Sequence, residues 1–160
     1  MRCVLFAAVI LLLIWPCISA AQQHDSPFDG NWKVEFSCEG STGVYAERCK
    51  EGMRDIFAIS GLTQVENENR VCGDYVASIQ LGNKVDERSS PDFPGMDGYI
   101  DGDTAYVIFG DAISGGRATI RIKDEKLYWK VTHRWDERHI LPDEAILSRD
   151  SSSRYRRRSC

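Results

Sequence analysis

The feature of this sequence that most constrains its fold is an alternation of apolar and polar residues. In the stretch NWKVEFSC, apolar residues at 32, 34, 36 and 38 alternate with polar residues at 33, 35 and 37. The same alternation recurs within 70–82 and within 117–135. Because successive side chains of a strand point to opposite faces, this pattern is typical of strands that bury one face. The sequence therefore predicts an all-β protein.

Turn-forming residues divide the chain into roughly eight strands, a number that suits a small closed barrel. We expect a single antiparallel up-and-down β-barrel, because closure removes exposed strand edges. A two-sheet β-sandwich is the alternative. A helix of about ten or more residues is not indicated anywhere, although 46–57 is compatible with one or two helical turns. The expected strands lie at 31–38, 54–62, 70–82, 98–110 (a hairpin turning at Asp101–Gly102), 117–135 (a hairpin turning at Asp124–Glu125) and 144–149.

The two ends of the chain differ from its middle in composition. Residues 1–20 predict a secretory signal peptide, because Arg2 precedes an apolar run of about 12 residues, shorter than the roughly 20 that span a membrane. Residues 21–150 are expected to form the β-barrel domain, and residues 151–160, SSSRYRRRSC, a basic flexible tail. We accordingly expect an exported protein, periplasmic or extracellular, without a transmembrane segment.

The body of the protein is acidic although its last residues are basic. Of the 20 Lys and Arg residues, one lies in the signal peptide and four lie in the last ten residues, so the body keeps 15 against all 24 Asp and Glu residues. Binding to nucleic acid needs clustered basic residues, so the composition argues against a nucleic-acid partner. The basic tail suits contact with an anionic surface, either lipid head groups or the acidic body itself.

The cysteines predict disulfides. Four remain after the signal peptide is removed, Cys38, Cys49, Cys72 and Cys160, and an even number in an exported chain indicates disulfide pairing. In an up-and-down barrel, Cys38 and Cys49 lie at one end, whereas Cys72 begins a strand at the other end, where the tail emerges. Cys38–Cys49 is therefore the preferred pair and Cys72–Cys160 the second; the other pairings stay open.

Long loops are the expected place of binding. Loops held on a rigid scaffold commonly carry binding residues, and in an up-and-down barrel the longest connections fall at one end. These connections are 39–53, 82–96, 111–115 and 136–143. The candidate ligand-binding or partner-binding residues at this end are Arg48, Lys84, Arg88, Phe93, Trp129, His133, Trp135, Arg138 and His139.

The stretch HRWDERH, residues 133–139, most resembles a catalytic or metal site. His133 continues the inward phase of Trp129, so we expect it to point into the barrel near Trp135, as a pocket wall or a core residue. Two histidines need a further ligand to bind zinc, and their spacing across a strand–loop junction fixes no geometry. We expect no metal and no cofactor. The alternative is a small hydrolase or metal-binding protein that uses His133 and His139 with nearby carboxylates.

The start of the expected mature chain, FDGNW at 28–32, resembles a group of small exported bacterial β-domains that open with a D-G-x-W strand. The stretches VCGDY, LGNKVDE and LYWKV add to this resemblance, which implies an exported β-fold and no particular activity. We therefore expect an exported, non-enzymatic binding protein that acts through its long loops on an unknown protein or small molecule. An inhibitor or immunity-type factor against a cationic target is one form of this expectation, because opposite charges speed encounter.

Overall fold

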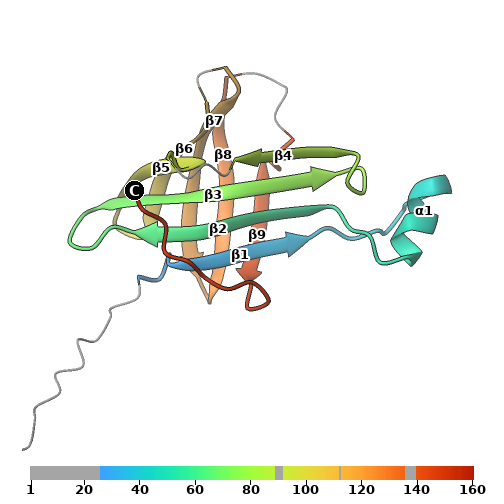
Figure 1. The fold of residues 1–160 in the computed structure, drawn as a ribbon, viewed down its shortest axis with the longest axis horizontal. Helices are drawn as coiled ribbons and strands as arrows, with labels where there is room; N and C mark the ends of the chain where they lie inside the picture. Colours follow the sequence, from blue (N-terminus) through green and yellow to red (C-terminus); the bar gives the residue numbers. More distant parts are fainter. Residues whose placement is uncertain (1–25, 89–91, 112, 136–139) are drawn as a thin grey trace, which may run out of the picture.

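The computed structural model describes residues 26–88, 92–111, 113–135 and 140–160, and within them it contains nine strands and one helix (Figure 1). The helix is α1 (Gly43–Lys50), which lies in the connection after the first strand. The structure is therefore nearly all-β, as the alternating pattern predicts. The strands are β1 (Gly30–Glu35), β2 (Ile56–Gln64), β3 (Arg70–Ile79), β4 (Lys84–Arg88), β5 (Met96–Asp101), β6 (Thr104–Gly110), β7 (Gly115–Lys123), β8 (Lys126–Arg134) and β9 (Glu144–Arg149).

Eight of these strands form a closed antiparallel barrel. β1 pairs with β2, β2 with β3 and β3 with β5, and β5 to β9 continue as a meander. The circle closes where β9 pairs with β1, at Trp32–Arg149 and Lys33–Ser148. The predicted up-and-down barrel is thus confirmed.

β4 is an extra strand outside the circle. The first half of β3, from Arg70 to Gly73, pairs with β5, and the second half, from Tyr75 to Ile79, pairs with β4. β4 and β5 therefore run in the same direction along β3, one after the other, like two halves of a single interrupted strand. The sequence predicts a loop over 82–96, which is wrong for 84–88, because KVDER is mostly charged and shows no apolar alternation.

Two-residue turns connect the hairpins at the tight end of the barrel. Asp101 pairs with Thr104, so the first turn occupies Gly102 and Asp103, one residue later than predicted. Gly102 has a φ of 60°, a left-handed conformation that glycine adopts without strain. The second turn lies at Asp124–Glu125, as predicted, and both of its residues have a positive φ, of 51° and 59°.

The barrel interior is a packed core. Trp32, Phe57, Phe109 and Trp129 are almost completely buried. The ring centroid of Trp129 lies 5.2 Å from that of Phe57, in an edge-to-face arrangement, and 5.4 Å from that of Phe109, in a tilted arrangement. Such contacts stabilise aromatic pairs beyond the effect of area burial. Side chains therefore fill this barrel, as they commonly do in barrels of about eight strands.

Both expected disulfides are present. Cys38 after β1 is bonded to Cys49 on α1, and Cys72 on β3 is bonded to Cys160 at the C-terminus. The two bridges confirm the pairing that the up-and-down topology favours. Among the described residues, no helix has both the length and the apolar character needed to cross a membrane.

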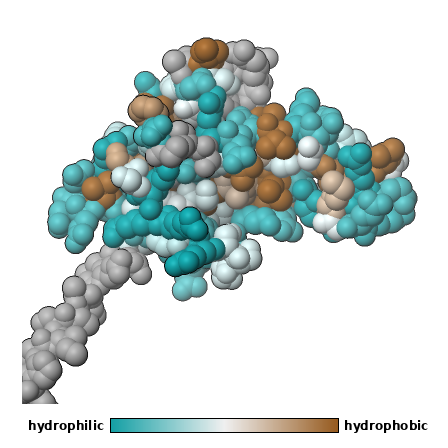
Figure 2. All heavy atoms as spheres, viewed as in Figure 1, coloured by the Kyte–Doolittle hydropathy of each residue, from teal (hydrophilic) through white to brown (hydrophobic). Residues whose placement is uncertain are grey.

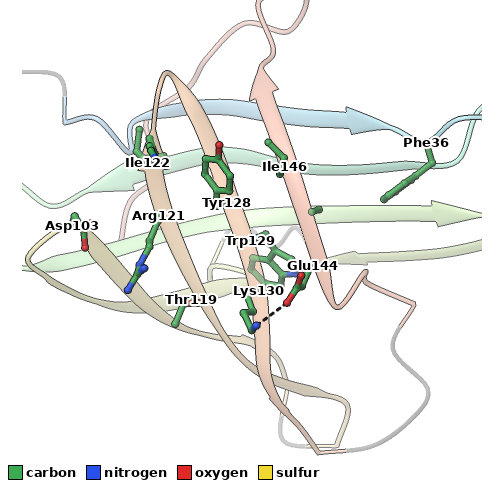
Figure 3. Close-up of a pocket in the computed structure, with 12 residues that line it drawn as sticks. Phe36, Asp103, Thr119, Arg121, Ile122, Tyr128, Trp129, Lys130, Glu144 and Ile146 are labelled. Atoms are coloured by element: carbon green, nitrogen blue, oxygen red, sulfur yellow. Dashed lines mark ion pairs between the residues drawn. The ribbon is translucent and has the colours of Figure 1, made fainter.

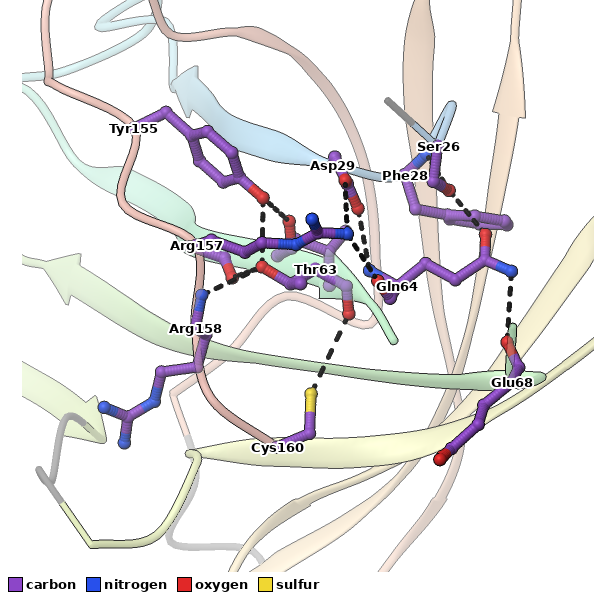
Figure 4. A network of polar contacts seen from close by, with 12 residues as sticks. Ser26, Phe28, Asp29, Thr63, Gln64, Glu68, Tyr155, Arg157, Arg158 and Cys160 are labelled. Carbon is purple, nitrogen blue, oxygen red and sulfur yellow. Dashed lines mark hydrogen bonds and ion pairs between the residues drawn. The ribbon is translucent and has the colours of Figure 1, made fainter. Parts of the chain in front are cut away.

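Residues 151–160, which the sequence predicts to be a flexible tail, lie against the outer face of β2 and β3 (Figures 1 and 4). The Tyr155 hydroxyl is 3.0 Å from Oγ1 of Thr63, and the Arg158 backbone N–H donates to the same oxygen at 2.9 Å. Nε of Arg158 lies 3.3 Å from Oδ2 of Asp74. Thr63 and Asp74 are consequently buried although they point away from the core. The basic tail thus contacts the acidic body, on a face that is mostly hydrophilic (Figure 2).

Candidate binding site

The long connections expected at one end of the barrel lie in two separate regions. α1, which carries Arg48, and the β3–β4 turn, which precedes Lys84, lie at one extremity of the molecule (Figure 1). The β6–β7 connection and the end of β8, which is followed by Trp135, lie at another. Arg138 and His139 fall outside the described residues. The described candidate residues therefore do not form one cluster.

Two of the candidates take part in contacts between connections. Arg88 at the end of β4 forms an ion pair with Asp111, which follows β6. Asp111 also accepts two backbone N–H groups from the turn after it, and these bonds, together with Arg88, hold the pKa of its carboxyl below the ordinary value. The carbonyl of Phe93 accepts a hydrogen bond from Nη2 of Arg158 at 2.9 Å, whereas its side chain is exposed. Arg88 therefore joins connections, and Phe93 presents an apolar ring to solvent.

His133 points outward and not into the barrel. The register of β7 with β8 shifts, so that Ala118 faces Val131 whereas Arg117 faces His133. One extra residue in β8, a β-bulge, reverses the phase of the residues that follow. His133 is therefore exposed, and the next residue, Arg134, is partly buried. The prediction that His133 lines the interior is wrong for this reason.

The barrel mouth next to Trp129 is filled. Nε1 of Trp129 donates a hydrogen bond of 2.9 Å to the carbonyl of Pro142, and Leu141 is buried in the same core. Nη2 of Arg134 donates to the carbonyl of Leu141 at 2.7 Å and so holds this segment in place. Trp135 is 40% exposed. Trp129 thus belongs to the core and Trp135 to the surface.

A groove of about 940 Å³ runs over the outer wall of the barrel across β7, β8 and β9 (Figure 3). We call it the β7–β9 groove. Most of the side chains that line it stand on the outer face of these strands, and Phe36 reaches it from the chain just after β1. Its lining residues are Phe36, Asp103, Thr119, Arg121, Ile122, Lys123, Tyr128, Trp129, Lys130, Glu144, Ala145 and Ile146.

Two rows of side chains cross the floor of the groove. One row consists of Arg121, Tyr128 and Ile146, which face one another in register across β7, β8 and β9. The other consists of Thr119, Lys130 and Glu144. Tyr128 is 36% exposed and Ile146 is 55% exposed. The first row therefore offers apolar surface beside a guanidinium group.

Hydrogen bonds and an ion pair hold Lys130, Glu144 and Arg121, three of the charged groups of the groove. Nζ of Lys130 lies 2.7 Å from Oε1 of Glu144 (Figure 3), and this hydrogen-bonded contact raises the pKa of Lys130. Nε of Arg121 donates to Oγ1 of Thr104 at 2.8 Å. An exposed ion pair such as Lys130–Glu144 adds little to the free energy of unfolding. Its effect here is that the two charges compensate each other and do not face an incoming partner unpaired.

The lining of the groove combines aromatic, aliphatic and guanidinium groups. Aromatic residues and arginine are enriched among the contact residues of protein interfaces. The described residues contain no group of three or more His, Cys, Asp or Glu side chains placed to hold a metal ion. Tyr128 and Ile146 are not among the residues predicted to bind, although the sequence carries a signal for them: both are large apolar residues in the outward phase of a strand.

The chain is matched by no family model, no curated protein and no solved structure.

Proposed function

We propose that this chain is an exported, non-enzymatic binding protein and that a partner protein docks on the β7–β9 groove. One observation carries the proposal: Tyr128 and Ile146 are exposed side by side in a groove, with Arg121 in register beside them. Most of the binding energy of a protein interface comes from a few residues, among which tyrosine and arginine are enriched. Strands of a closed barrel are also preorganised, so little conformational entropy is lost on binding.

Export is supported by the N-terminal sequence and by the cysteine chemistry. Residues 1–20 have the charge and apolar pattern of a signal peptide. Disulfides such as Cys38–Cys49 and Cys72–Cys160 form and persist in oxidising compartments. An inhibitor or immunity-type factor is the form of binding protein that suits a rigid surface acting on another exported protein.

The groove is a better binding surface than the long connections. The candidate residues of those connections are divided between two regions of the molecule, whereas the groove residues are contiguous in register on three neighbouring strands. The acidic body can still speed encounter with a cationic partner, because long-range attraction acts mainly on the association rate. We therefore expect salt to slow association and to leave dissociation from the groove nearly unchanged.

Affinity capture with the mature protein tests the proposal. Ile146→Asp places a carboxylate in the groove, and Tyr128→Ala removes its aromatic ring. We expect each change to weaken retention of the partner by about thirtyfold or more, as at the centre of other interfaces. Ile108→Asp is the matched control, because Ile108 is 49% exposed on β6 and does not line the groove.

A partner retained by the wild type and by the Ile108 variant, but released by both groove variants, supports the proposal. Retention that is the same in all four proteins would place the interface elsewhere. Circular dichroism and disulfide content establish that the variants fold alike, so that a loss of capture reports on the surface.

A further inference from the structure

The strand pairing that closes the barrel is incomplete. The β1–β9 register joins Trp32 to Arg149 and stops after one further pair. Continued in the same register, residues 34–37 would face residues 144–147, but within the described part of the chain no such pairs form. β1 nevertheless remains paired with β2 as far as Glu35. The two strands therefore diverge, and we call the opening between 34–37 and 144–147 the β1–β9 seam.

The edge of β9 at the seam lacks the protection that another free edge of the protein has. β4 ends the sheet order, and four of its five residues, Lys84, Asp86, Glu87 and Arg88, are charged. Charged side chains on an edge strand discourage pairing with another chain. On β9, residues 145–147 are Ala, Ile and Leu, and the charge of Glu144 at the end of this edge is paired with Lys130. Because β1 does not pair with residues 144–147, this edge is the place where a further strand could add.

The seam continues into the β7–β9 groove. Phe36 lines the groove from the side of β1, and Ala145 and Ile146 line it from β9 (Figure 3). Phe36 and Ala145 are partly buried against the core, whereas Ile146 is exposed on the outer face. A strand that adds to β9 would point alternate side chains to these two sides. The inner side offers Phe36 and Ala145 and the outer side offers Ile146, so such a strand can bury side chains on each of its faces.

The charged side chains that flank the seam are compensated within the protein. Nζ of Lys33 lies 2.6 Å from Oε1 of Glu35, and Nζ of Lys130 lies 2.7 Å from Oε1 of Glu144. A charged residue of an incoming strand would therefore lose water without gaining a free counter-charge. Charge complementarity at the seam favours an uncharged segment.

We infer that the β1–β9 seam binds an extended, uncharged segment of the partner protein, which adds as a strand to residues 144–147 of β9. The inference rests on the proposed function, because it states how the partner enters the same groove. In strand addition, main-chain hydrogen bonds supply affinity and the flanking pockets select alternate side chains. β-branched residues suit such a segment best, because they favour the extended conformation.

A heptapeptide of alternating valine and threonine, labelled with a fluorophore, is the probe. Fluorescence anisotropy with the mature, disulfide-bonded protein is expected to show saturable binding that changes by less than about twofold between low and high salt, because the probe is uncharged. Two N-methylated forms, one methylated at the valines and one at the threonines, keep the side chains and remove the donors of one strand edge each. At least one form is expected to bind about tenfold more weakly. Equal binding by the parent and both methylated forms would overturn strand addition.

The matching protein variants are Ile146→Lys and Ile108→Lys. Ile146→Lys gives the edge of β9 the kind of charge that protects β4 and is expected to weaken the probe by about tenfold. Ile108→Lys adds the same charge at a similarly exposed position outside the groove and is expected to bind like the wild type. Hydrogen exchange of the wild type needs no variant: the probe is expected to slow exchange within 144–147, and unchanged exchange would contradict the inference.

Strand addition and the proposed function fail in different experiments. Partner capture that is lost in Ile146→Asp, combined with probe binding that ignores N-methylation, overturns strand addition and leaves docking on the groove intact. Methylation-sensitive probe binding, combined with partner capture that ignores Ile146→Asp, overturns docking on the groove. A wild-type dimer that Ile146→Lys dissociates would overturn the inference in another way, because a second copy of this chain would then occupy the seam.

Discussion

Removing the Cys72–Cys160 disulfide is expected to lower stability clearly more than removing Cys38–Cys49. The first bridge joins residues 88 positions apart, and the second joins residues 11 positions apart. A cross-link restricts the unfolded chain, and in the chain-entropy treatment this effect grows with the logarithm of loop length. The two separations correspond to about 4.6 and about 2.8 kcal/mol, so the expected difference in the free energy of unfolding is about 2 kcal/mol.

Loss of the tail contacts is expected to change this difference in the free energy of unfolding only a little. Cys72 is completely buried, and alanine leaves a small apolar side chain in its place. If the freed tail detaches, water reaches Thr63 and Asp74, so these groups exchange protein partners for water and are not left unsatisfied. The loss of loop entropy in the unfolded state therefore dominates the difference between the two variants.

Urea denaturation under non-oxidising and non-reducing conditions measures the difference. Trp32 and Trp129 are buried, so tryptophan fluorescence reports unfolding of the barrel. The double variant C72A/C160A is expected to unfold at a lower urea concentration than C38A/C49A, with a similar dependence on urea. A chain that ends at residue 150 and carries Cys72→Ala measures the tail contacts separately and is expected to lie within about 1 kcal/mol of C72A/C160A. Equal stability of the two double variants, or a larger loss in C38A/C49A, would refute the reasoning from loop length.

In the turn Asp124–Glu125 both residues hold left-handed conformations, so Asp124→Asn with Glu125→Gly is expected to raise the free energy of unfolding by about 0.5–1 kcal/mol in urea denaturation. An unchanged midpoint would contradict this. Burial raises the pKa of the Tyr75 hydroxyl above that of a free phenol. The neutral hydroxyl therefore makes its full contribution to the free energy of unfolding at neutral pH, and this contribution is lost as the pH rises beyond about 10. Ultraviolet titration is expected to show a tyrosine that ionises only when the protein unfolds. The pKa of Asp111 is lowered by backbone N–H groups and by Arg88. The ionised carboxylate therefore makes its full contribution to the free energy of unfolding above the ordinary pKa of 3.8, and this contribution is lost as the pH falls through the lowered pKa. Carboxyl titration by NMR is expected to find Asp111 ionised below that value, and Asp111→Asn is expected to remove this part of the acid sensitivity.

The barrel follows from the sequence because alternation is a local property of each strand. The apolar residues of 31–38 and 117–123 identify a buried face without knowledge of any partner strand. The same topology brings Cys38 near Cys49 and Cys72 near the tail, so the disulfides follow as well. β4 cannot be predicted from the apolar pattern, because it is a mostly charged segment whose backbone groups are hydrogen-bonded to β3. Nothing in the side chains of KVDER records that pairing.

The wrong predictions about the candidate site have a different cause. They depend on the register between neighbouring strands, which the pattern within one strand does not determine. A single bulge opposite Arg117 reverses the orientation of His133, and a bulge leaves no mark in the alternation itself. The β7–β9 groove depends on the register that aligns Arg121, Tyr128 and Ile146, which are far apart in sequence. Composition predicts a tail that is separate from the body. The contacts of the tail with Thr63 and Asp74, and its disulfide, join segments far apart in sequence, which a local pattern does not record.

Photo-cross-linking at position 146 tests most directly whether a partner docks on the β7–β9 groove. Ile146 is replaced by the photoreactive residue p-benzoylphenylalanine, and the same replacement at Ile108 serves as the control. The protein is irradiated in the native exported fraction. We predict a covalent adduct with one discrete partner from position 146 and none from position 108. Adducts of equal yield from both positions, or from position 108 alone, would contradict the central claim.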